Sequence, residues 1–359
     1  MDRHQPTIDA LTHHGWDHSN SIVLHGMEKM YANTNSPKYF NYIKSFVDSF
    51  VDGKGNVTGL RPALDGMHPG LLCLFMYEKT GEAKYKTAAT IIRNYLIGTP
   101  SNPSPFNKTP EGGYWHSQSD GNKNVMSVDG IYMAHPFLVK YGKMFNDTEC
   151  FDIATFQLLL VAEKSFNITT KLPYHGWDHT KSKPWANPIT GTSTQHWSRS
   201  TGWFSMALVD ILESLPLSHK NYKNILFLFQ QLAEGIKENQ HPTLGYWYHV
   251  LNKQEVSGNY PESSTTGMVT YSIMKGVNLG LLDKSYEEVA IKGWKGLQGF
   301  IKVYSDGKPQ ITSFTPGMGY KNDLADYLTV VPVSCPTTTG TQHPHGYCAV
   351  LMASSVMEK

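Results

Sequence analysis

The sequence predicts an all-α fold, specifically an (α/α)6 barrel formed by one domain that covers residues 1–359. Two kinds of helical segment alternate along the chain: one is amphipathic, and the other is apolar nearly all round. Helices that are apolar all round are buried, whereas an amphipathic helix keeps one face in water. Glycines open the apolar segments at intervals of roughly 64 to 79 residues, which indicates a loose structural repeat. This alternation favours a ring of buried helices inside a ring of amphipathic ones.

Six apolar segments are candidates for the inner ring. The first follows Trp16-Asp17, and the others begin near Asp65-Gly66, Asp129-Gly130, Thr201-Gly202, Thr266-Gly267 and His345-Gly346.

Five amphipathic segments are candidates for the outer ring. In the first of them, apolar residues at positions 39, 43, 46, 47 and 50 follow the spacing of one helix face. We expect the sixth outer helix, missing or truncated, to precede Trp16. An open solenoid is the alternative, but the connections at about 98–128, 167–197 and 305–344 are long. Structureless loops beyond ~12–15 residues are usually functional in a compact domain. The five segments begin near Lys38, Lys84, Asp147, Lys220 and Lys284.

The composition narrows the class of partner. Lys plus Arg is 31 and Asp plus Glu is 30, and no basic run is present, which argues against nucleic acid or a membrane surface. Aromatic residues make up 12% of the chain, which suits carbohydrate stacking, although a large aromatic core is the simpler explanation. No apolar stretch approaches the ~20 residues of a membrane span. Residues 1–15 do not form a signal peptide, so a periplasmic or cytoplasmic location stays open. We expect a monomer or weak dimer without a cofactor.

Two acidic residues are the candidates for catalysis. In an (α/α)6 barrel the N-termini of the inner helices meet on one rim, where unpaired N–H groups favour an anion. Asp65 and Asp129 both precede a glycine at this rim. A helix N-cap is the structural alternative for each of them. If they face one cavity, like charge should keep one of the two protonated and able to act as an acid.

Basic and aromatic residues cluster farther along the chain. Arg199 lies between Trp197 and Trp203, and an arginine fork matches a carboxylate, with a structural ion pair as the alternative. His175 and Trp177 occupy one short string, and His116 lies in the first long connection; all three are candidates for substrate binding, Trp177 by stacking on a sugar ring. For His175, a hydrogen bond within the loop is the alternative. The pairs at 175/179 and 343/345 could suggest a metal, but no carboxylate or cysteine completes a ligand set, so we expect none.

Three motifs together resemble the unsaturated uronyl hydrolases, above all the unsaturated rhamnogalacturonyl hydrolases of glycoside hydrolase family 105. They are DGIYM at 129–133, YHGWD at 174–178 and WSRSTGW at 197–203. The resemblance implies an (α/α)6 barrel and a substrate that ends in a 4-deoxy uronic acid with a C4=C5 double bond. It also implies that Asp129 gives a proton to C4, after which water adds at C5 and the hemiketal opens. By the same resemblance, Asp65 positions the water.

The resemblance also assigns the pocket. His175, Arg199 and Trp203 match substrate-binding residues, and Trp197 and His116 follow the pattern less closely. The expected substrate is an uronyl-rhamnose fragment of rhamnogalacturonan type, with an ulvan-type fragment as an alternative.

Two other functions are left open by the residues. One is an inverting glycosidase on a saturated polysaccharide, whose two carboxyls would need to lie ~6.5–9.5 Å apart. The other is a non-catalytic carbohydrate-binding protein.

Overall fold

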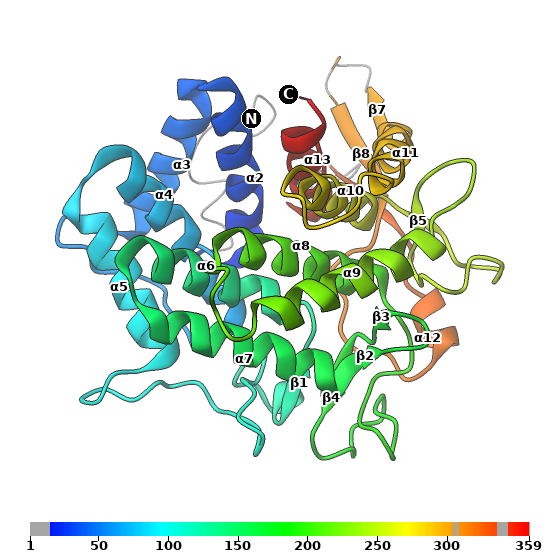
Figure 1. Cartoon of the computed structure of the whole chain (residues 1–359), viewed down its shortest axis with the longest axis horizontal. Helices are drawn as coiled ribbons and strands as arrows, with labels where there is room; N and C mark the ends of the chain where they lie inside the picture. Colours follow the sequence, from blue (N-terminus) through cyan, green and yellow to red (C-terminus); the bar gives the residue numbers. More distant parts are fainter. Residues whose placement is uncertain (1–14, 304–306, 308, 336–343, 359) are drawn as a thin grey trace.

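Six inner helices form a closed ring in the computed structural model, which describes residues 15–303, 307, 309–335 and 344–358. Each of these helices packs against the next in chain order, and the last packs against the first. The contact between the two helices at opposite ends of the described sequence therefore closes the ring (Figure 1). The six helices are α2 (His18–Thr34), α4 (Gly70–Thr80), α6 (Gly130–Phe145), α8 (Ser198–Ser214), α10 (Ser263–Asn278) and α13 (Pro344–Met357).

The outer helices each pack against the inner helix that precedes them in the chain. In α3, Ile43, Phe46 and Val47 are buried, as the apolar spacing predicts. This arrangement confirms the predicted helical barrel, and the sixth outer helix expected before Trp16 lies outside the described residues. The outer helices are α3 (Pro37–Phe50), α5 (Ala83–Ile97), α7 (Thr148–Ser165), α9 (Tyr222–Glu238) and α11 (Tyr286–Gln298).

The inner helices are buried all round but are not purely apolar. Helix α10 is buried from Ser263 to Gly276 and contains several serines and threonines. Two of these hydroxyls donate to a carbonyl four residues earlier: Ser272 Oγ to Met268 at 2.9 Å and Thr266 Oγ1 to Glu262 at 2.7 Å. Such bonds need no partner from farther away in the chain. Thr265 Oγ1 instead donates to the Ser198 hydroxyl of α8 at 2.8 Å.

Three inner helices begin away from the predicted glycine pairs. Asp65 and Gly66 lie in a separate 3-10 helix, η2 (Leu64–Met67), and α4 begins only at Gly70, directly after Pro69. Proline suits a helix start because the first N–H groups have no intrahelical partner. Helices α8 and α10 begin at Ser198 and Ser263, a few residues before their glycines.

Short antiparallel strands and two further short helices lie in the connections between helices. Strand β1 precedes α6 and pairs with β4, with Ser127 opposite Gly176. Strands β1 to β4 and α12 gather at the lower side of Figure 1, and β6 leads directly into α10. The strand pairs therefore connect the segments that enter the inner helices. The elements are η3 (Asp120–Asn122), β1 (Val125–Ser127), β2 (Phe166–Asn167), β3 (Leu172–Pro173), β4 (Gly176–Asp178), β5 (Trp247–Tyr248), β6 (Pro261–Glu262), β7 (Ile301–Val303), β8 (Pro309–Phe314), α12 (Leu324–Leu328) and β9 (Val333–Cys335).

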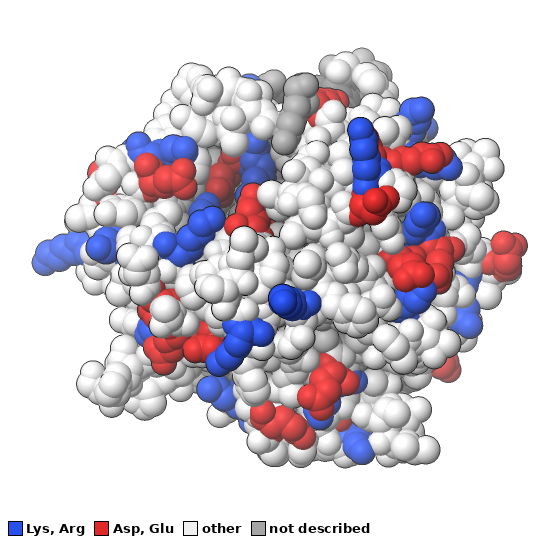
Figure 2. All heavy atoms as spheres, viewed as in Figure 1, with Lys and Arg blue, Asp and Glu red and all other residues white. Residues whose placement is uncertain are grey.

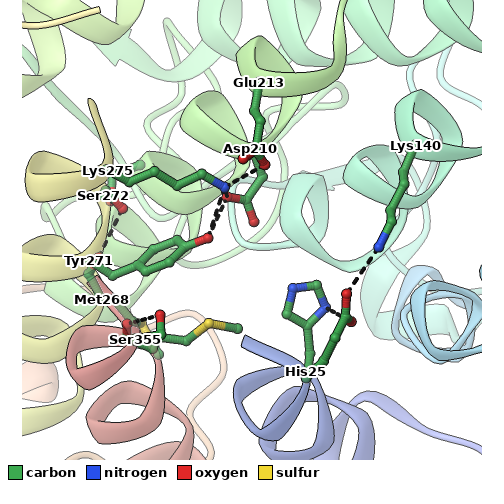
Figure 3. Close-up of polar contacts among 12 residues, drawn as sticks. His25, Lys140, Asp210, Glu213, Met268, Tyr271, Ser272, Lys275 and Ser355 are labelled. Carbon is green, nitrogen blue, oxygen red and sulfur yellow. Dashed lines mark hydrogen bonds and ion pairs between the residues drawn. The ribbon is translucent and has the colours of Figure 1, made fainter. Parts of the chain in front are cut away.

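Ion pairs join the inner helices near their C-terminal ends (Figure 3). Lys275 of α10 lies 2.8 Å from Asp210 and 2.7 Å from Glu213, both on α8. Lys140 of α6 lies 3.0 Å from Glu28 of α2. Buried charges require such partners because they have lost their hydration. These ion pairs lie at the C-terminal side of the ring, so the charged residues at the N-terminal rim, on the opposite side, are not part of them.

Charges of both signs are interspersed on the face shown in Figure 2. Within the described residues, no helix is both long enough and apolar enough to cross a membrane.

Candidate active site

The candidate acids lie at the N-terminal rim of the inner helices. Asp129 directly precedes α6, and Asp65 lies in η2, ahead of α4. Asp129, in its ionised form, lies close enough to His116, His175 and Arg199 to favour the protonated form of each. Asp129 and three residues from other segments of the chain therefore share one electrostatic environment.

Asp129 occupies the N-cap position of α6 without capping it. Its backbone is already helical, with φ −65° and ψ −28°, and its side chain accepts no hydrogen bond from the helix N–H groups. One carboxylate oxygen, Oδ1, accepts a hydrogen bond from the Ser127 hydroxyl. By contrast, Asp17 and Glu262 do cap α2 and α10. The N-cap explanation for an acid at this position therefore fails for Asp129.

Asp65 lies between two imidazoles. Its Oδ2 is 3.5 Å from His116 Nε2 and 3.6 Å from His18 Nδ1. Burial alone would raise the pKa of Asp65, but the charges of His18 and His116 reverse that effect and hold it well below its usual range. Asp65 is therefore ionised.

The sequence predicts that one of the two acids stays protonated, and Asp65 is not that one. The nearby groups that dominate its titration are imidazoles of opposite charge, which stabilise the carboxylate. Burial lowers the pKa of His116, but Asp65 outweighs burial and raises it to about 9. The proton of this pair therefore lies on the imidazole and not on the carboxyl group.

His18 was not among the predicted site residues. It is the first residue of α2, and its Nδ1 lies 2.7 Å from Asp17 Oδ1. Burial lowers its pKa, but Asp65 and Asp17 produce a net increase. The sequence did contain a signal, because His18 follows the Trp16-Asp17 pair that marks the first inner helix.

Arg199 is buried and directed towards the segment before α12. Its guanidinium donates to the carbonyl oxygens of Thr315 and Pro316, the latter at 2.7 Å. The guanidinium carbon lies 4.8 Å from the centre of the Trp197 ring. Its Nε is buried and lacks a hydrogen-bond partner among the described residues. Two of its five N–H donors thus hold the backbone, and others are left for a further acceptor. Among the residues that the structure describes, Arg199 forms no ion pair with a carboxylate, so the structural ion pair considered as the alternative is not found there.

His175 lies in an aromatic cluster. Its ring centre is 4.4 Å from that of Trp197 and 4.6 Å from that of Tyr320. Its Nδ1 is 3.1 Å from the hydroxyl of Tyr327. Burial lowers the pKa of His175 to about 4, although Asp129 opposes this change, so the ring is neutral at pH 7.

Tyr320 and Tyr327 are additional members of this cluster that the sequence motifs did not reveal. Both come from the connection at 305–344, whose length was the only signal. Tyr320 also stacks on Trp185, with ring centres 4.3 Å apart.

The two remaining indoles occupy different places. Trp203 of α8 is buried inside the ring and stacks on Tyr132 of α6, with ring centres 5.0 Å apart. Trp177 of β4 donates through its Nε1 to the Thr190 carbonyl at 2.9 Å, and Lys164 of α7 covers its ring. These contacts direct Trp177 towards the outer layer and not towards the acids.

Side chains for a metal do not converge in the described part of the chain. No group of three or more His, Cys, Asp or Glu residues there could hold a metal ion. The arrangement is instead suited to acid–base chemistry on an anionic sugar. It combines one uncapped carboxyl group, one ionised carboxylate with a protonated histidine, and an aromatic wall.

Comparison with known proteins also indicates an enzyme that acts on sugars, a glycoside hydrolase. Residues 1–359 match the family model Glycosyl Hydrolase Family 88. A solved structure of a family 105 glycoside hydrolase from C. acetobutylicum ATCC 824 is 30% identical and has a TM-score of 0.86. The alignment with this structure covers 96% of the present chain and 94% of that chain.

Two curated relatives have more specific names. The unsaturated 3S-rhamnoglycuronyl hydrolase of Alteromonas sp. (strain LOR) is 34% identical over 247 residues, which are 68% of this chain and 54% of that protein. The unsaturated rhamnogalacturonyl hydrolase YesR of Bacillus subtilis (strain 168) is 21% identical over 271 residues, 74% of this chain and 72% of that protein.

Proposed function

Because the chain belongs to the glycoside hydrolases of families 88 and 105, we propose that it removes a 4,5-unsaturated uronic acid from the non-reducing end of an oligosaccharide. The observation that carries this proposal is the pair of acids with different surroundings. Asp129 is free of any capping role, whereas Asp65 is fixed as a carboxylate by His116 and His18. One acid can therefore exchange a proton while the other accepts a hydrogen bond from water.

The reaction begins with proton transfer from Asp129 to C4 of the C4=C5 double bond. The positive charge that forms at C5 is shared with the ring oxygen. Water then adds at C5 and returns a proton to Asp129, which restores the acid. The resulting hemiketal opens and releases the next sugar, so the net reaction consumes one water molecule.

Asp65 would orient the attacking water. Its ionised carboxylate can only accept hydrogen bonds, and a water molecule can donate one while its lone pair faces C5. His116 keeps Asp65 ionised and adds positive charge near the uronate. The N–H groups at the start of the inner helices favour the same anion.

The remaining pocket assignments rest on position. His175, Trp197 and Arg199 would form one wall, with Trp203 deeper inside the ring. A neutral His175 can donate one hydrogen bond to a sugar or accept one.

For the sugar after the cleaved bond, we favour rhamnose. The names of the two curated relatives both specify a rhamnose-containing substrate. We therefore propose a rhamnogalacturonan-type uronyl-rhamnose fragment, and an ulvan-type fragment is the other substrate to test.

The experiment is incubation with lyase digests of rhamnogalacturonan and of ulvan, beside saturated oligosaccharides of the same backbones. The ultraviolet absorbance of the conjugated double bond should fall on an unsaturated digest, because protonation at C4 and addition of water at C5 consume the double bond. Release of sugar from the saturated oligosaccharides alone would instead support an inverting glycosidase. Binding without any product would support a non-catalytic carbohydrate-binding protein.

A further inference from the structure

We infer that His18 is a positioning residue for Asp65 and that Asp17 holds His18 in place. This inference rests on the proposed role of Asp65, which orients the attacking water. Beyond keeping Asp65 ionised, His18 decides which of its two carboxylate oxygens is left for that water. Neither His18 nor Asp17 lies in the motifs at 129–133, 174–178 and 197–203.

The two imidazoles around Asp65 contact the same oxygen atom. His116 Nε2 lies 3.5 Å and His18 Nδ1 lies 3.6 Å from Oδ2 of Asp65. Two positive charges at nearly equal distances hold Oδ2, and Oδ1 is left to accept a hydrogen bond from water. The Asp65 side chain is 21% exposed, so water can reach it. Because His18 begins α2 and His116 lies in the connection before β1, Asp65 is held by two separate parts of the chain.

One nitrogen of His18 faces two carboxylates. Nδ1 lies 2.7 Å from Asp17 Oδ1 as well as 3.6 Å from Asp65 Oδ2. Nδ1 is buried, and neither carboxylate is aligned to accept a hydrogen bond from it, so both contacts act through charge. The two negative charges favour the imidazolium form and raise the pKa of His18 although burial opposes them. The ring of His345 on α13 lies 5.9 Å from the ring of His18 and limits its movement.

Asp17 is itself fixed at both carboxylate oxygens. It is the N-cap of α2, where Oδ1 accepts a hydrogen bond from the backbone N–H of Ser19 at 3.1 Å. Its other oxygen, Oδ2, accepts from the Arg61 guanidinium. The side chains therefore form a chain of alternating charge that runs from Arg61 through Asp17 and His18 to Asp65. Each member of this chain restricts the orientation of the next.

A purely structural role is the alternative for these ion pairs, since they also join α2 to η2. In that case, loss of His18 would lower the free energy of unfolding and leave the kcat of the folded protein unchanged. A positioning role instead lowers kcat in a protein that is still folded, because the effect passes through the water held by Asp65.

The test measures kcat and KM of two single variants and of the double variant on an unsaturated digest. His18→Ala removes one of the two charges that hold Oδ2 and should lower kcat roughly tenfold with little change in KM. Asp17→Asn removes the charge that orients His18 but keeps the cap of α2, because asparagine caps a helix about as well as aspartate. It should lower kcat roughly threefold. In the His18→Ala background, Asp17→Asn should have no further effect.

Matched changes separate charge from packing. His219→Ala removes another histidine that faces a carboxylate, 3.4 Å from Asp152 of the outer helix α7, and should keep wild-type kcat. Added imidazole should restore part of the lost kcat in His18→Ala, because it brings back a ring that can carry the charge. Pyrazole has the same size but stays neutral in neutral solution, so it should restore little.

An unchanged kcat in His18→Ala would overturn the positioning role, as would additive losses from His18→Ala and Asp17→Asn or equal effects of the two added rings. Crystal structures of the wild type and of His18→Ala provide a readout that does not depend on turnover. The Asp65 carboxylate should change its orientation in the variant, and an unchanged orientation also overturns the role. If the wild type consumes no unsaturated substrate, the proposed function fails instead, and the crystal structures alone decide on His18.

Discussion

The pair formed by Asp65 and His116 should make the stability of the protein fall as the solution becomes alkaline. Asp65 raises the pKa of His116 to about 9 although burial opposes it, whereas an unfolded histidine titrates near ~6.5. A group whose pKa is higher in the folded protein than in the unfolded chain stabilises the folded state. This contribution is complete when the pH is below the unfolded pKa, and it is lost as the pH rises through the folded pKa. The window of loss therefore runs from about 6.5 to about 9. The difference between the folded and unfolded pKa of His116 corresponds to on the order of 3 kcal/mol of unfolding free energy.

Denaturant unfolding at several pH values in this window, on wild type and Asp65→Asn, measures the effect. Asparagine keeps the shape of the side chain but removes the charge that holds the proton on His116. The decline should be present in the wild type and largely absent from the variant. Glu111→Gln is a matched control, since it breaks the carboxylate pair with the partly exposed His179 at 2.8 Å. A surface pair contributes little, so this control should keep the wild-type decline. Equal declines in wild type and Asp65→Asn would refute the assignment.

Three further perturbations test other parts of the structure. Lys275→Met should lower the free energy of unfolding by roughly 3–5 kcal/mol, measured with denaturant, because it leaves Asp210 buried without its cation. The control Lys292→Met loses only a surface pair with Glu288 and should lower it by less than ~1 kcal/mol. Equally small losses in both variants would show that the interior pair is dispensable. Gly130→Ala would place a methyl 2.8 Å from His116 Nδ1, so kcat should fall as His116 moves from Asp65, and an unchanged kcat would show that this contact is not needed. Arg199→Lys should weaken binding of an uronate roughly tenfold to a hundredfold while changing binding of its methyl ester little; equal losses on both would restrict Arg199 to anchoring the carbonyls of Thr315 and Pro316.

Much of the fold could be predicted because the two helix types differ in periodicity. The spacing of Ile43, Phe46 and Val47 identifies one face of α3, and a local pattern is enough to find it. The helix starts were less accurate: Pro69, and not the Asp65-Gly66 pair, marks the entry to α4.

Site residues could be predicted from the sequence only where a chemically suitable side chain directly precedes an inner helix. Asp129 and Asp65 precede inner helices, so the rim argument located both. Their protonation could not be read in the same way, because the partners of Asp65 come from α2 and from the connection before β1. Tyr320 was missed because its position depends on contact with Gly176, far away in the sequence. Similarly, the donors of Arg199 are evident in its side chain, but its acceptors at residues 315 and 316 are set by tertiary structure.

The most direct test of the proposed chemistry is the rate at which Asp129→Asn consumes the double bond of an unsaturated uronyl-rhamnose digest. Asparagine can accept the hydrogen bond from Ser127 but cannot transfer a proton. Positioned proton transfer typically contributes ~10²–10⁴-fold, and the proposed reaction uses Asp129 twice. We expect kcat to fall by at least about a hundredfold, with substrate still bound and the fold unchanged. Turnover close to that of the wild type would contradict the role of Asp129 as the acid.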